Sequence, residues 1–496
     1  MISDRVSDAT ERYSGPVQML IGGHWIDAVS SETIPVENPA RAEVIATVPR
    51  GRAADVDLAV TAAARAFPEW RATAPRERGR MLTAIGMDMQ SAIESIARTI
   101  ATETGNALRT QSRPEATTAA DVFRYFGGLA SELKGETIPL SNRLLSYNLR
   151  EPIGVVGAII PWNSPVSLGA IKIAMALGAG NTLVLKAAED APLAVLKMAE
   201  ICARHLPSGV LNVVTGYGEE AGRAVTGHPG IRKLSFTGST EVGREVIRAA
   251  ADRIVPVSLE LGGKSPVIVF PDATDDAVVD GIISGMRFTR QGQSCTAGSR
   301  LFLHASITDA FLARLVDKLE RLVVGDPLDE RTDMGSLINR KQFDRVCGYI
   351  EDGLGQPGVQ VALGGLPASR ATDVKGYFVN PTVLANVDND WRIAREEIFG
   401  PVLCVIPWTD VDDAIRMANQ SHYGLAAFVW SHNISLALNT AHAIEAGWVQ
   451  VNQGIGQILG QSYGGVKESG IGREMSLEGM LEAFTQRRSV TVNLGF

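Results

Sequence analysis

Residues 233–251, KLSFTGSTEVGREVIRAAA, combine an apolar run, a glycine and an amphipathic segment. The run predicts a β-strand at 234–236, and the spacing after it predicts a helix at 240–251. A strand that passes through glycine into a helix aims backbone N–H groups and the positive helix end at one point, which suits a phosphate or pyrophosphate. Ser239 and Thr240 fill the pattern between Gly238 and Gly243, so it differs from the usual G-x-G-x-x-G. Capping of the helix by Ser or Thr explains these residues equally well.

The same alternation of strand and helix extends on both sides of this stretch. Further strands are predicted at 155–160, 182–185, 210–214 and 257–261, and further helices at 165–177, 191–205 and 219–226. A second alternating region runs from about residue 265 to 466, with strands at 300–303 and 402–406 and a helix at 309–322. Fully apolar strands separated by amphipathic helices are typical of a parallel sheet covered on both faces. The sequence therefore predicts an α/β protein with two doubly wound parallel sheets.

Two segments fit neither region. Residues 132–151 are predicted to be extended, and the tail at 487–494 contains a short strand, 489–492, with nothing after it to pair with. Unpaired strand edges promote association. Pairing between subunits would satisfy both, so we expect a homodimer or homotetramer.

The composition excludes several classes of protein. The 496 residues carry 47 Lys and Arg against 55 Asp and Glu, a formal net charge of −8, which argues against a nucleic-acid partner. No segment approaches the roughly 20 apolar residues of a membrane span, and the N-terminus shows no signal peptide, so no membrane association is expected. The four cysteines are widely spaced without a C-x-x-C motif, which indicates neither a disulfide framework nor a metal site. We therefore expect a cytoplasmic protein.

One cysteine stands in unusual surroundings. Cys295 lies in the segment GQSCTAG at 292–298, where glycines and small polar residues predict an accessible turn. A cysteine in such a turn can act as a nucleophile. The other three, Cys202, Cys347 and Cys404, are interpreted as small hydrophobic core residues, the commoner role of a cysteine.

Three strand ends carry further candidates. Glu260 ends an apolar strand beside two glycines, where a buried carboxylate can have a raised pKa and serve as a general base. An ion pair with Lys264 is the simpler alternative. Asn163 follows the strand at 155–160 and offers an amide donor for an oxyanion, or a cap for the next helix. A lysine and a glutamate follow the strand at 182–185, at the sheet edge where nucleotides bind.

In their order and spacing these motifs resemble those of the NAD(P)-dependent aldehyde dehydrogenase superfamily, over nearly the whole chain. The matching stretches are PWN at 161–163, KAAE at 186–189, FTGST at 236–240, ELGGK at 260–264, GQSC at 292–295, EEIFGP at 396–401, VN at 451–452 and GGVKESG at 464–470. The resemblance implies a Rossmann-like NAD-binding domain at 1–131 and 152–261 and a catalytic domain at 262–473. A small β oligomerisation element is expected at 132–151 and 474–496.

The resemblance also implies roles for individual residues. Cys295 is the expected nucleophile that forms a thiohemiacetal and then a thioester. Asn163 and the Cys295 backbone N–H are expected to hold the oxyanion, and Glu260 to activate the hydrolytic water. Trp162 is expected to contact the cofactor. The other residues expected there are Lys186 and Glu189 (adenosine ribose), Gly238 and Ser239 (pyrophosphate), Glu397 (nicotinamide ribose) and Phe399 (nicotinamide ring). Glu189 favours NAD, because its charge opposes a 2′-phosphate, although Lys186 leaves NADP open.

Departures from the family pattern concern the substrate. Ser164 follows Asn163, and QSY at 461–463 replaces a more usual Ser-Pro-Phe. With Gln457 and Ser294, they predict a polar substrate tunnel. Two arginines that precede the cysteine, Arg287 and Arg290, either attract an acidic substrate or face solvent.

The leading interpretation is an NAD-dependent enzyme that oxidises an aldehyde to a carboxylic acid. A CoA-acylating semialdehyde dehydrogenase is disfavoured by Glu260, because those members generally lack the hydrolytic carboxylate. A catalytically silent binding protein of the same fold is disfavoured by the joint presence of Cys295, Glu260 and Asn163. A thiol hydrolase would need a histidine near Cys295, and no motif places one there.

Overall fold

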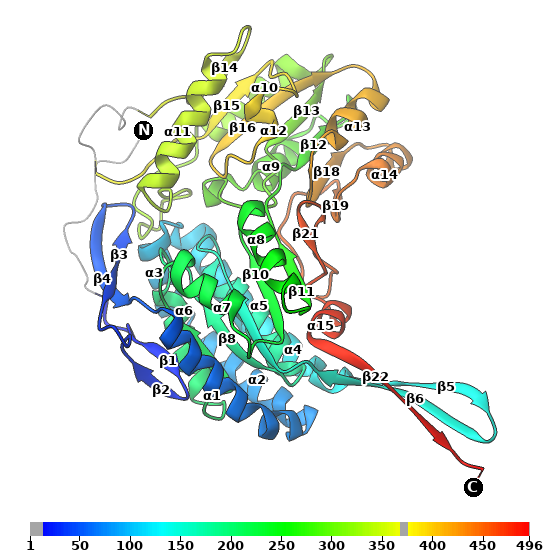
Figure 1. Ribbon diagram of the computed structural model, residues 1–496. Coiled ribbons are helices and arrows are strands. Elements are labelled where there is room, and N and C mark those ends of the chain that lie inside the picture. The colour runs from blue at the N-terminus through cyan, green and yellow to red at the C-terminus, as the bar shows by residue number, and fades with distance from the viewer. Residues whose placement is uncertain (1–12, 368–374, 496) are drawn as a thin grey trace.

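The computed structural model describes residues 13–367 and 375–495 and contains two α/β bodies and a projecting arm (Figure 1). The segments 1–12, 368–374 and 496, assigned above to the three predicted parts of the chain, lie outside the described residues.

The first body is built on an eight-stranded sheet with a parallel centre. Its order is β2 (His24–Ile26), β1 (Met19–Ile21), β9 (Leu211–Val214), β8 (Thr182–Lys186), β7 (Val155–Ile159), β10 (Lys233–Thr237), β11 (Val257–Glu260) and β21 (Gly470–Ile471). The strands predicted from apolar runs, β7 to β11, pair in parallel. The edge strands β1, β2 and β21 are antiparallel. They have two or three residues each, too few for a pattern of apolar residues to identify them.

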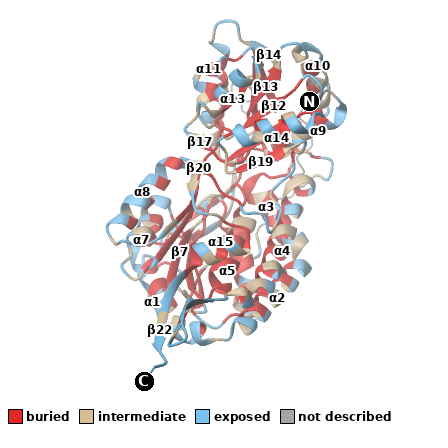
Figure 2. Cartoon of the chain, turned by 90° about the vertical axis from the view of Figure 1, so that its right-hand side faces the viewer, coloured by how far each residue is buried: buried red, intermediate tan, exposed pale blue. Residues whose placement is uncertain are grey.

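Helices cover both faces of this sheet. One face carries α1 (Ala53–Ala72), α7 (Arg223–Gly227) and α8 (Thr240–Ala251), and the other carries α5 (Pro165–Gly178) and α6 (Leu193–Ala203), backed by α2 (Pro75–Ser91), α3 (Ile93–Thr104) and α4 (Arg113–Leu129). Side chains of β8 alternate between the two layers, with Val184 in one core and Leu183 and Leu185 in the other. This alternation is the period of a strand, and it explains why the predicted strands are apolar throughout. Figure 2 shows the buried residues concentrated in the sheets and the inner helices.

Two buried glutamates of the outer helices cap the inner ones. Glu115 Oε1 accepts hydrogen bonds from the backbone N–H groups of Val166 (2.9 Å) and Ser167 (3.3 Å) at the start of α5. Glu103 does the same at the start of α6. Neither inner helix has a side-chain cap from its own N-cap residue, so the outer layer satisfies donors that the inner helices leave open.

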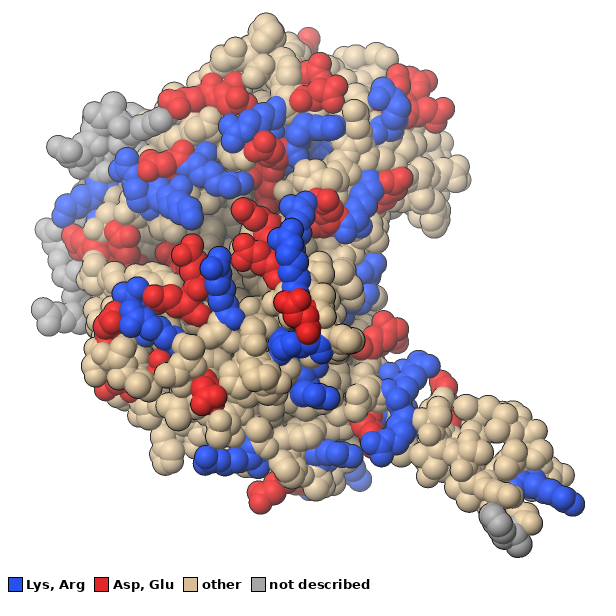
Figure 3. Space-filling model, viewed as in Figure 1, with Lys and Arg blue, Asp and Glu red and all other residues tan. Residues whose placement is uncertain are grey.

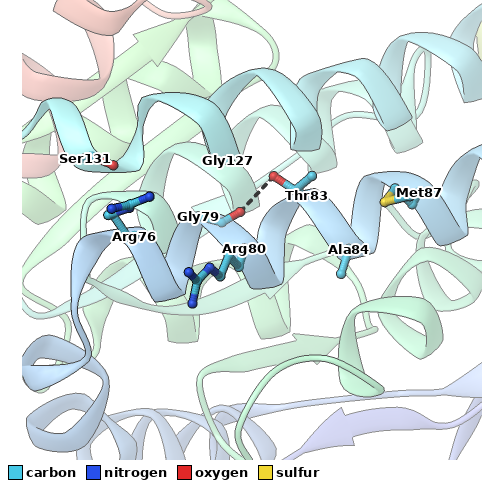
Figure 4. A pocket seen from close by; sticks show the side chains of 8 residues that line it. All are labelled: Arg76, Gly79, Arg80, Thr83, Ala84, Met87, Gly127 and Ser131. Atoms are coloured by element: carbon cyan, nitrogen blue, oxygen red, sulfur yellow. Dashed lines mark hydrogen bonds between the residues drawn. The ribbon is translucent and has the colours of Figure 1, made fainter.

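Helices α2 and α4 pack at close range through glycine. A Cβ at Gly79 would lie 2.4 Å from the carbonyl oxygen of Gly127. Figure 4 shows this approach beside a surface pocket of about 340 Å³, which is also lined by Arg76, Arg80 and Met87. None of the residues predicted above for catalysis or cofactor binding lines this pocket.

The second body repeats the plan with a seven-stranded sheet. Its order is β14 (Gln360–Leu363), β15 (Thr382–Ala385), β16 (Val402–Trp408), β13 (Arg300–His304), β12 (Pro266–Val269), β18 (Ala426–Trp430) and β19 (Trp448–Val451). Only β14 is antiparallel to its neighbour among these. One face carries α9 (Asp276–Gly285) and α10 (Thr308–Leu319), and the other carries α11 (Arg340–Leu354), α12 (Arg392–Arg395), α13 (Val411–Asn419) and α14 (Ile434–Ala443). The predicted fold class, two doubly wound sheets with an additional β element, is confirmed, with antiparallel strands added at the edges.

The arm corrects one expectation from the sequence. The two segments predicted to have unpaired edges pair with each other within one chain: β22 (Thr485–Asn493), which follows α15 (Leu477–Phe484), is antiparallel to β6 (Leu144–Pro152), and β6 is antiparallel to β5 (Glu136–Ser141). The sequence could not reveal this pairing, because the two segments are more than 300 residues apart. On the face shown in Figure 3 the arm is covered mainly by uncharged residues, whereas charges of both signs are interspersed over the two bodies.

The remaining elements are small. Two further strand pairs are β3 (Thr33–Asn38) with β4 (Glu43–Pro49), and β17 (Tyr423–Gly424) with β20 (Val466–Lys467). Short helical turns occur at η1 (Leu108–Ser112), η2 (Ala130–Glu132), η3 (Gly218–Gly222) and η4 (Phe288–Arg290). Within residues 13–367 and 375–495, no helix is both long and apolar enough to cross a membrane, and no three His, Cys, Asp or Glu side chains are grouped to hold a metal ion.

Candidate active site

The carboxyl ends of four neighbouring strands bring the predicted residues to one edge of the first sheet. Lys186 is the last residue of β8, Glu260 is the last residue of β11, Gly238 follows β10, and Asn163 lies shortly after β7. These strands are adjacent in the order β8-β7-β10-β11 and are parallel. The carboxyl edge of such a sheet is where α/β proteins bind ligands.

Cys295 approaches this edge on a loop between η4 and β13 of the second body. It is half-buried, whereas Cys202, Cys347 and Cys404 are buried, as predicted. Its Sγ lies 3.6 Å from the hydroxyl oxygen of Tyr463. Burial raises the pKa of the Cys295 thiol to about 11; the Tyr463 hydrogen bond lowers it, the carboxylates of Glu260 and Glu397 raise it, and the charge of Arg290 lowers it.

The loop before Cys295 has an unusual backbone. Arg287, Gln291 and Gly292 all have positive φ, at 59°, 52° and 63°. A Cβ at residue 292 would lie 2.1 Å from the carbonyl oxygen of Gly400, so only glycine fits there. Such left-handed residues are held in place by surrounding contacts.

Asn163 is one of those contacts. Its Nδ2 donates to the carbonyl oxygen of Gln293 at 3.0 Å, and the residue is buried. The alternative that Asn163 caps α5 is not what the structure shows, because the N-cap is Ser164. The amide of Asn163 therefore links the strand edge to the loop of Cys295.

Glu260 is buried without a hydrogen-bond partner. The residue is 4% exposed, and neither carboxylate oxygen has a partner within the described part of the chain. The ion pair with Lys264 is not formed, because the Lys264 Nζ is equally without a partner there. Burial raises the pKa of Glu260 well above its ordinary value, and the nearby Glu474 carboxylate raises it further, while Lys172 and Arg473 lower it. A Cβ at Gly464 would lie 2.9 Å from Glu260 Oε1, so glycine leaves space beside the carboxylate.

A buried ion pair near Glu260 was not predicted from the sequence. Lys172, on α5, and Glu474 form a buried pair, with both side chains almost fully removed from solvent. A lysine in the middle of a largely apolar helix was the one feature of the sequence that could have indicated a buried ion pair. Its partner lies 302 residues away, so only the fold could identify it.

The predicted adenosine-ribose residues form a pair at the end of β8. The Lys186 ammonium lies 2.6 Å from Glu189 Oε2; Lys186 is buried and Glu189 is partly open. Burial tends to raise the pKa of Glu189, but the charge and hydrogen bond of Lys186 outweigh it and lower the pKa below its ordinary value. Glu189 is therefore an ionised acceptor, as a ribose hydroxyl requires.

The glycine turn after β10 combines both interpretations offered above. Ser239 is the N-cap of α8, and its hydroxyl accepts a hydrogen bond from the Val242 N–H at 3.3 Å. The helix cap is thus real, and the N-terminus of α8 still stands at the carboxyl edge of the sheet next to Gly238. That position is compatible with an anionic group, since the helix end carries partial positive charge.

Glu397 and the two aromatic residues form a second group. Glu397 Oε1 accepts a hydrogen bond from the Gly263 N–H at 2.9 Å, and burial raises the pKa of Glu397 to about 7. The rings of Trp162 and Phe399 lie edge to face with centroids 5.4 Å apart, and Phe399 has a positive φ of 59°. Together with the residues at β8 and α8, these acceptors and rings fit the riboses and the base of a dinucleotide.

The residues predicted to line a polar tunnel form hydrogen bonds with other side chains. Ser164 Oγ accepts a hydrogen bond from Arg290. Gln457 hydrogen-bonds the hydroxyl of Tyr463. Burial raises the pKa of that hydroxyl well above its ordinary value, and the bond to Gln457 lowers it. Ser294 is buried against the hydroxyl of Thr296.

The chain is similar to known proteins over almost its whole length. The Aldehyde dehydrogenase family matches residues 25–490. The hydroxyisobutyraldehyde dehydrogenase of Mycolicibacterium austroafricanum is 44% identical over 98% of this chain and 96% of its own length. The structure of PnpE in complex with nicotinamide adenine dinucleotide has a TM-score of 0.94 at 40% identity, over 97% of this chain and 98% of that chain. An E. coli NADP-dependent enzyme has a TM-score of 0.93 at 36% identity, over 97% and 98%. The chain belongs to the aldehyde dehydrogenase family, whose members oxidise aldehydes with NAD(P) as cofactor.

Proposed function

We propose that this protein oxidises an aldehyde to a carboxylic acid through a thioester on Cys295, with NAD preferred over NADP. The observation that carries the proposal is the buried Glu260 carboxylate without a hydrogen-bond partner in the described residues, within electrostatic range of the Cys295 thiol. An unpaired buried carboxylate destabilises a fold, so its presence beside a nucleophile favours a role in the reaction.

The first half of the reaction uses Cys295 and Asn163. The Cys295 thiolate adds to the aldehyde carbon, and the resulting oxyanion accepts hydrogen bonds from Asn163 Nδ2 and the Cys295 backbone N–H. NAD(P), when bound, supplies the hydride acceptor. Loss of the hydride from the former aldehyde carbon leaves a thioester on Cys295. Since the thiol pKa is about 11, the thiol has to release its proton to solvent before the thiolate adds to the aldehyde.

The second half uses Glu260. The carboxylate takes a proton from water, the water oxygen adds to the thioester carbon, and Cys295 leaves as the thiolate. Overall, an aldehyde, NAD⁺ and water give a carboxylate, NADH and two protons. A CoA-acylating reaction does not need this base, so the retained Glu260 favours hydrolysis.

The preference for NAD rests on Glu189. Its ionised carboxylate, held by Lys186, suits the 2′-hydroxyl of NAD and would repel the 2′-phosphate of NADP. We assign Gly238 and Ser239 to the pyrophosphate, Glu397 to the nicotinamide ribose and Phe399 to the nicotinamide ring, with Trp162 as a further cofactor contact.

The domain boundaries and the assembly belong to the same proposal. We assign 1–131 and 152–261 to the NAD-binding domain, 262–473 to the catalytic domain, and 132–151 with 474–496 to an oligomerisation element. Strand β21, at the end of the catalytic segment, joins the first sheet and ties the two domains together. The arm exposes Leu140, Leu145 and Val492 at 54%, 42% and 39% and has open strand edges on β5 and β22, which supports a homodimer or homotetramer.

A single-turnover experiment tests the chemistry. With an aldehyde and excess NAD, Cys295→Ala should reduce NADH formation by at least about 10⁴-fold while NAD binding, measured by calorimetry, is retained. Glu260→Gln should give one equivalent of NADH per subunit and then stall, with steady turnover reduced about 10²- to 10⁴-fold.

A buried cysteine supplies the matched control. Cys202→Ala should keep steady turnover, because Cys202 lies in the core of α6. Unchanged turnover of Cys295→Ala would exclude the thioester route, and steady wild-type turnover of Glu260→Gln would exclude Glu260 as the hydrolytic base.

A further inference from the structure

Arg290 is a half-buried cation whose charge acts on the Cys295 thiol, and its hydrogen-bond partners among the described residues are neutral. Its Nε donates to Gln111 Oε1 at 2.9 Å, and its Nη1 donates to Ser164 Oγ at 2.6 Å. Within residues 13–367 and 375–495 it forms no ion pair with a carboxylate. Other arginines pair directly with carboxylates, as Arg113 does with Glu94 and Glu330.

The neutral partners of Arg290 are themselves fixed. Gln111 Nε2 donates to Thr289 Oγ1 at 2.7 Å, so the amide of Gln111 bridges two residues of the η4 turn. These bonds orient the guanidinium and engage Nε and Nη1, while Nη2 has no hydrogen bond to the described residues. A guanidinium so held presents N–H donors in a fixed geometry.

The position of Arg290 connects it to the reacting groups. Ser164, which it contacts, directly follows Asn163, the proposed oxyanion donor. Its charge also acts on the Cys295 thiol, whose pKa it lowers. Arg290 is therefore linked through Ser164 to the proposed oxyanion donor and acts electrostatically on the proposed nucleophile.

Two charged residues near Arg290, Arg287 and Glu115, contribute to the local electrostatics. Arg287 adds a second cation, but its guanidinium is occupied by the carbonyl oxygens of Ser284, Gly454 and Ile455, so its part is to hold a loop. Burial raises the pKa of Glu115 to about 7, and the charge of Arg290 lowers it. Glu115 Oε1 accepts a hydrogen bond from the backbone N–H of Val166 at the start of α5. Of these two arginines, Arg290 is thus the one whose Nη2 has no hydrogen bond to the described residues.

We propose that Arg290 binds a carboxylate on the substrate, so that the preferred substrates are short aldehydes with a second, anionic end and the products are dicarboxylates. A carboxylate matches the planar fork of a guanidinium and gains charge-assisted hydrogen bonds from it. The inference rests on the proposed function, because it names the substrate class of the same site.

The test compares three four-carbon aldehydes: succinic semialdehyde, butanal and 3-hydroxybutanal. In the wild-type enzyme, kcat/KM for succinic semialdehyde should exceed that for butanal at least tenfold. Arg290→Gln should lower this ratio about 10- to 100-fold, mainly through KM for succinic semialdehyde, and Arg290→Lys should restore part of it. The ratio is used because any change in the thiol pKa affects both substrates alike. Arg80→Gln, in the surface pocket of Figure 4, is the control and should leave the ratio unchanged.

The outcomes separate the two proposals. No oxidation of any aldehyde by the wild-type enzyme would contradict the proposed function. Oxidation of butanal with no preference for succinic semialdehyde would overturn the role of Arg290 alone, as would an unchanged ratio in Arg290→Gln. An equal loss with 3-hydroxybutanal would show recognition of an oxygen and not of a charge. If Arg290→Gln does not fold, competitive inhibition of wild-type butanal oxidation by succinate, but not by 1,4-butanediol, provides the same test.

Discussion

Two regions bring residues to the proposed reaction centre by different means. At the carboxyl edge of the first sheet, Lys186 and Glu260 are the last residues of regular strands, and the strand order places them. In the loop before Cys295, Arg287, Gln291 and Gly292 have left-handed backbone conformations that surrounding atoms have to maintain. Each such residue other than glycine costs about 1–2 kcal/mol.

The difference predicts different responses to mutation. At the strand edge a side chain can change its chemistry while the backbone stays, because the sheet supports it. In the loop a small change of shape is expected to displace Cys295 itself. Three predictions test this comparison.

The largest effect is expected from Gly292→Ala. The new methyl group would lie 2.1 Å from the Gly400 carbonyl oxygen, at a φ of 63° that alanine rarely adopts. We expect a loss of stability of about 2–4 kcal/mol and at least a tenfold loss of activity, measured by thermal unfolding and NADH formation. Gly348→Ala in α11 is the control: nothing lies within 4 Å of its Cβ position, and alanine should stabilise that helix by about 0.5–1 kcal/mol. Equal stability of the two variants would contradict the view that the loop is strained.

An intermediate effect is expected from Tyr463→Phe. The hydroxyl stays protonated, because burial raises its pKa well above its ordinary value, and it can donate to the Cys295 sulfur at 3.6 Å. Removing this bond should raise the thiol pKa above about 11, so the fraction of thiolate at neutral pH falls. The rate of the first turnover should fall about three- to tenfold at pH 7.5 and recover as the pH rises, and the whole pH profile should move upward.

A pH profile of Tyr463→Phe that coincides with the wild-type profile would show that the hydroxyl only fills space. A lower rate with no pH shift would assign it to substrate contact instead.

The smallest effect is expected at the strand edge, from Glu189→Gln. The change removes the charge that opposes a 2′-phosphate and leaves an amide that still contacts a ribose. The ratio of kcat/KM for NAD to that for NADP should fall about three- to tenfold, with stability nearly unchanged. Glu320→Gln, an exposed residue of the second body, removes the same charge and should leave the ratio as it is. A higher preference for NAD in Glu189→Gln would show that the carboxylate points away from the ribose.

The regular parts of the fold could be predicted because their signal is local. The strands β7 to β11 and the helices α5 and α8 follow the apolar runs and amphipathic segments to within one or two residues. The edge strands β1, β2 and β21 escaped prediction, since two or three residues carry no period. The pairing of β22 with β6 also escaped it, because no local pattern tells a tail which distant strand it meets.

The candidate site divides in the same way. Cys295, Glu260 and Asn163 stand out through their neighbours in the sequence. The Lys172–Glu474 pair and the Gln111–Arg290–Ser164 contacts do not, because their members come from separate elements and only meet in the folded chain.

The sequence by itself determined the fold class and the family and indicated the candidate reactive residues, since these depend on local periodicity and on motifs a few residues long. The tertiary structure decided which groups have partners. It left the Glu260 carboxylate buried without a hydrogen bond in the described residues, paired the arm within one chain, and held Arg290 between neutral side chains. These properties depend on burial and on contacts between distant segments, which no single stretch of the chain contains.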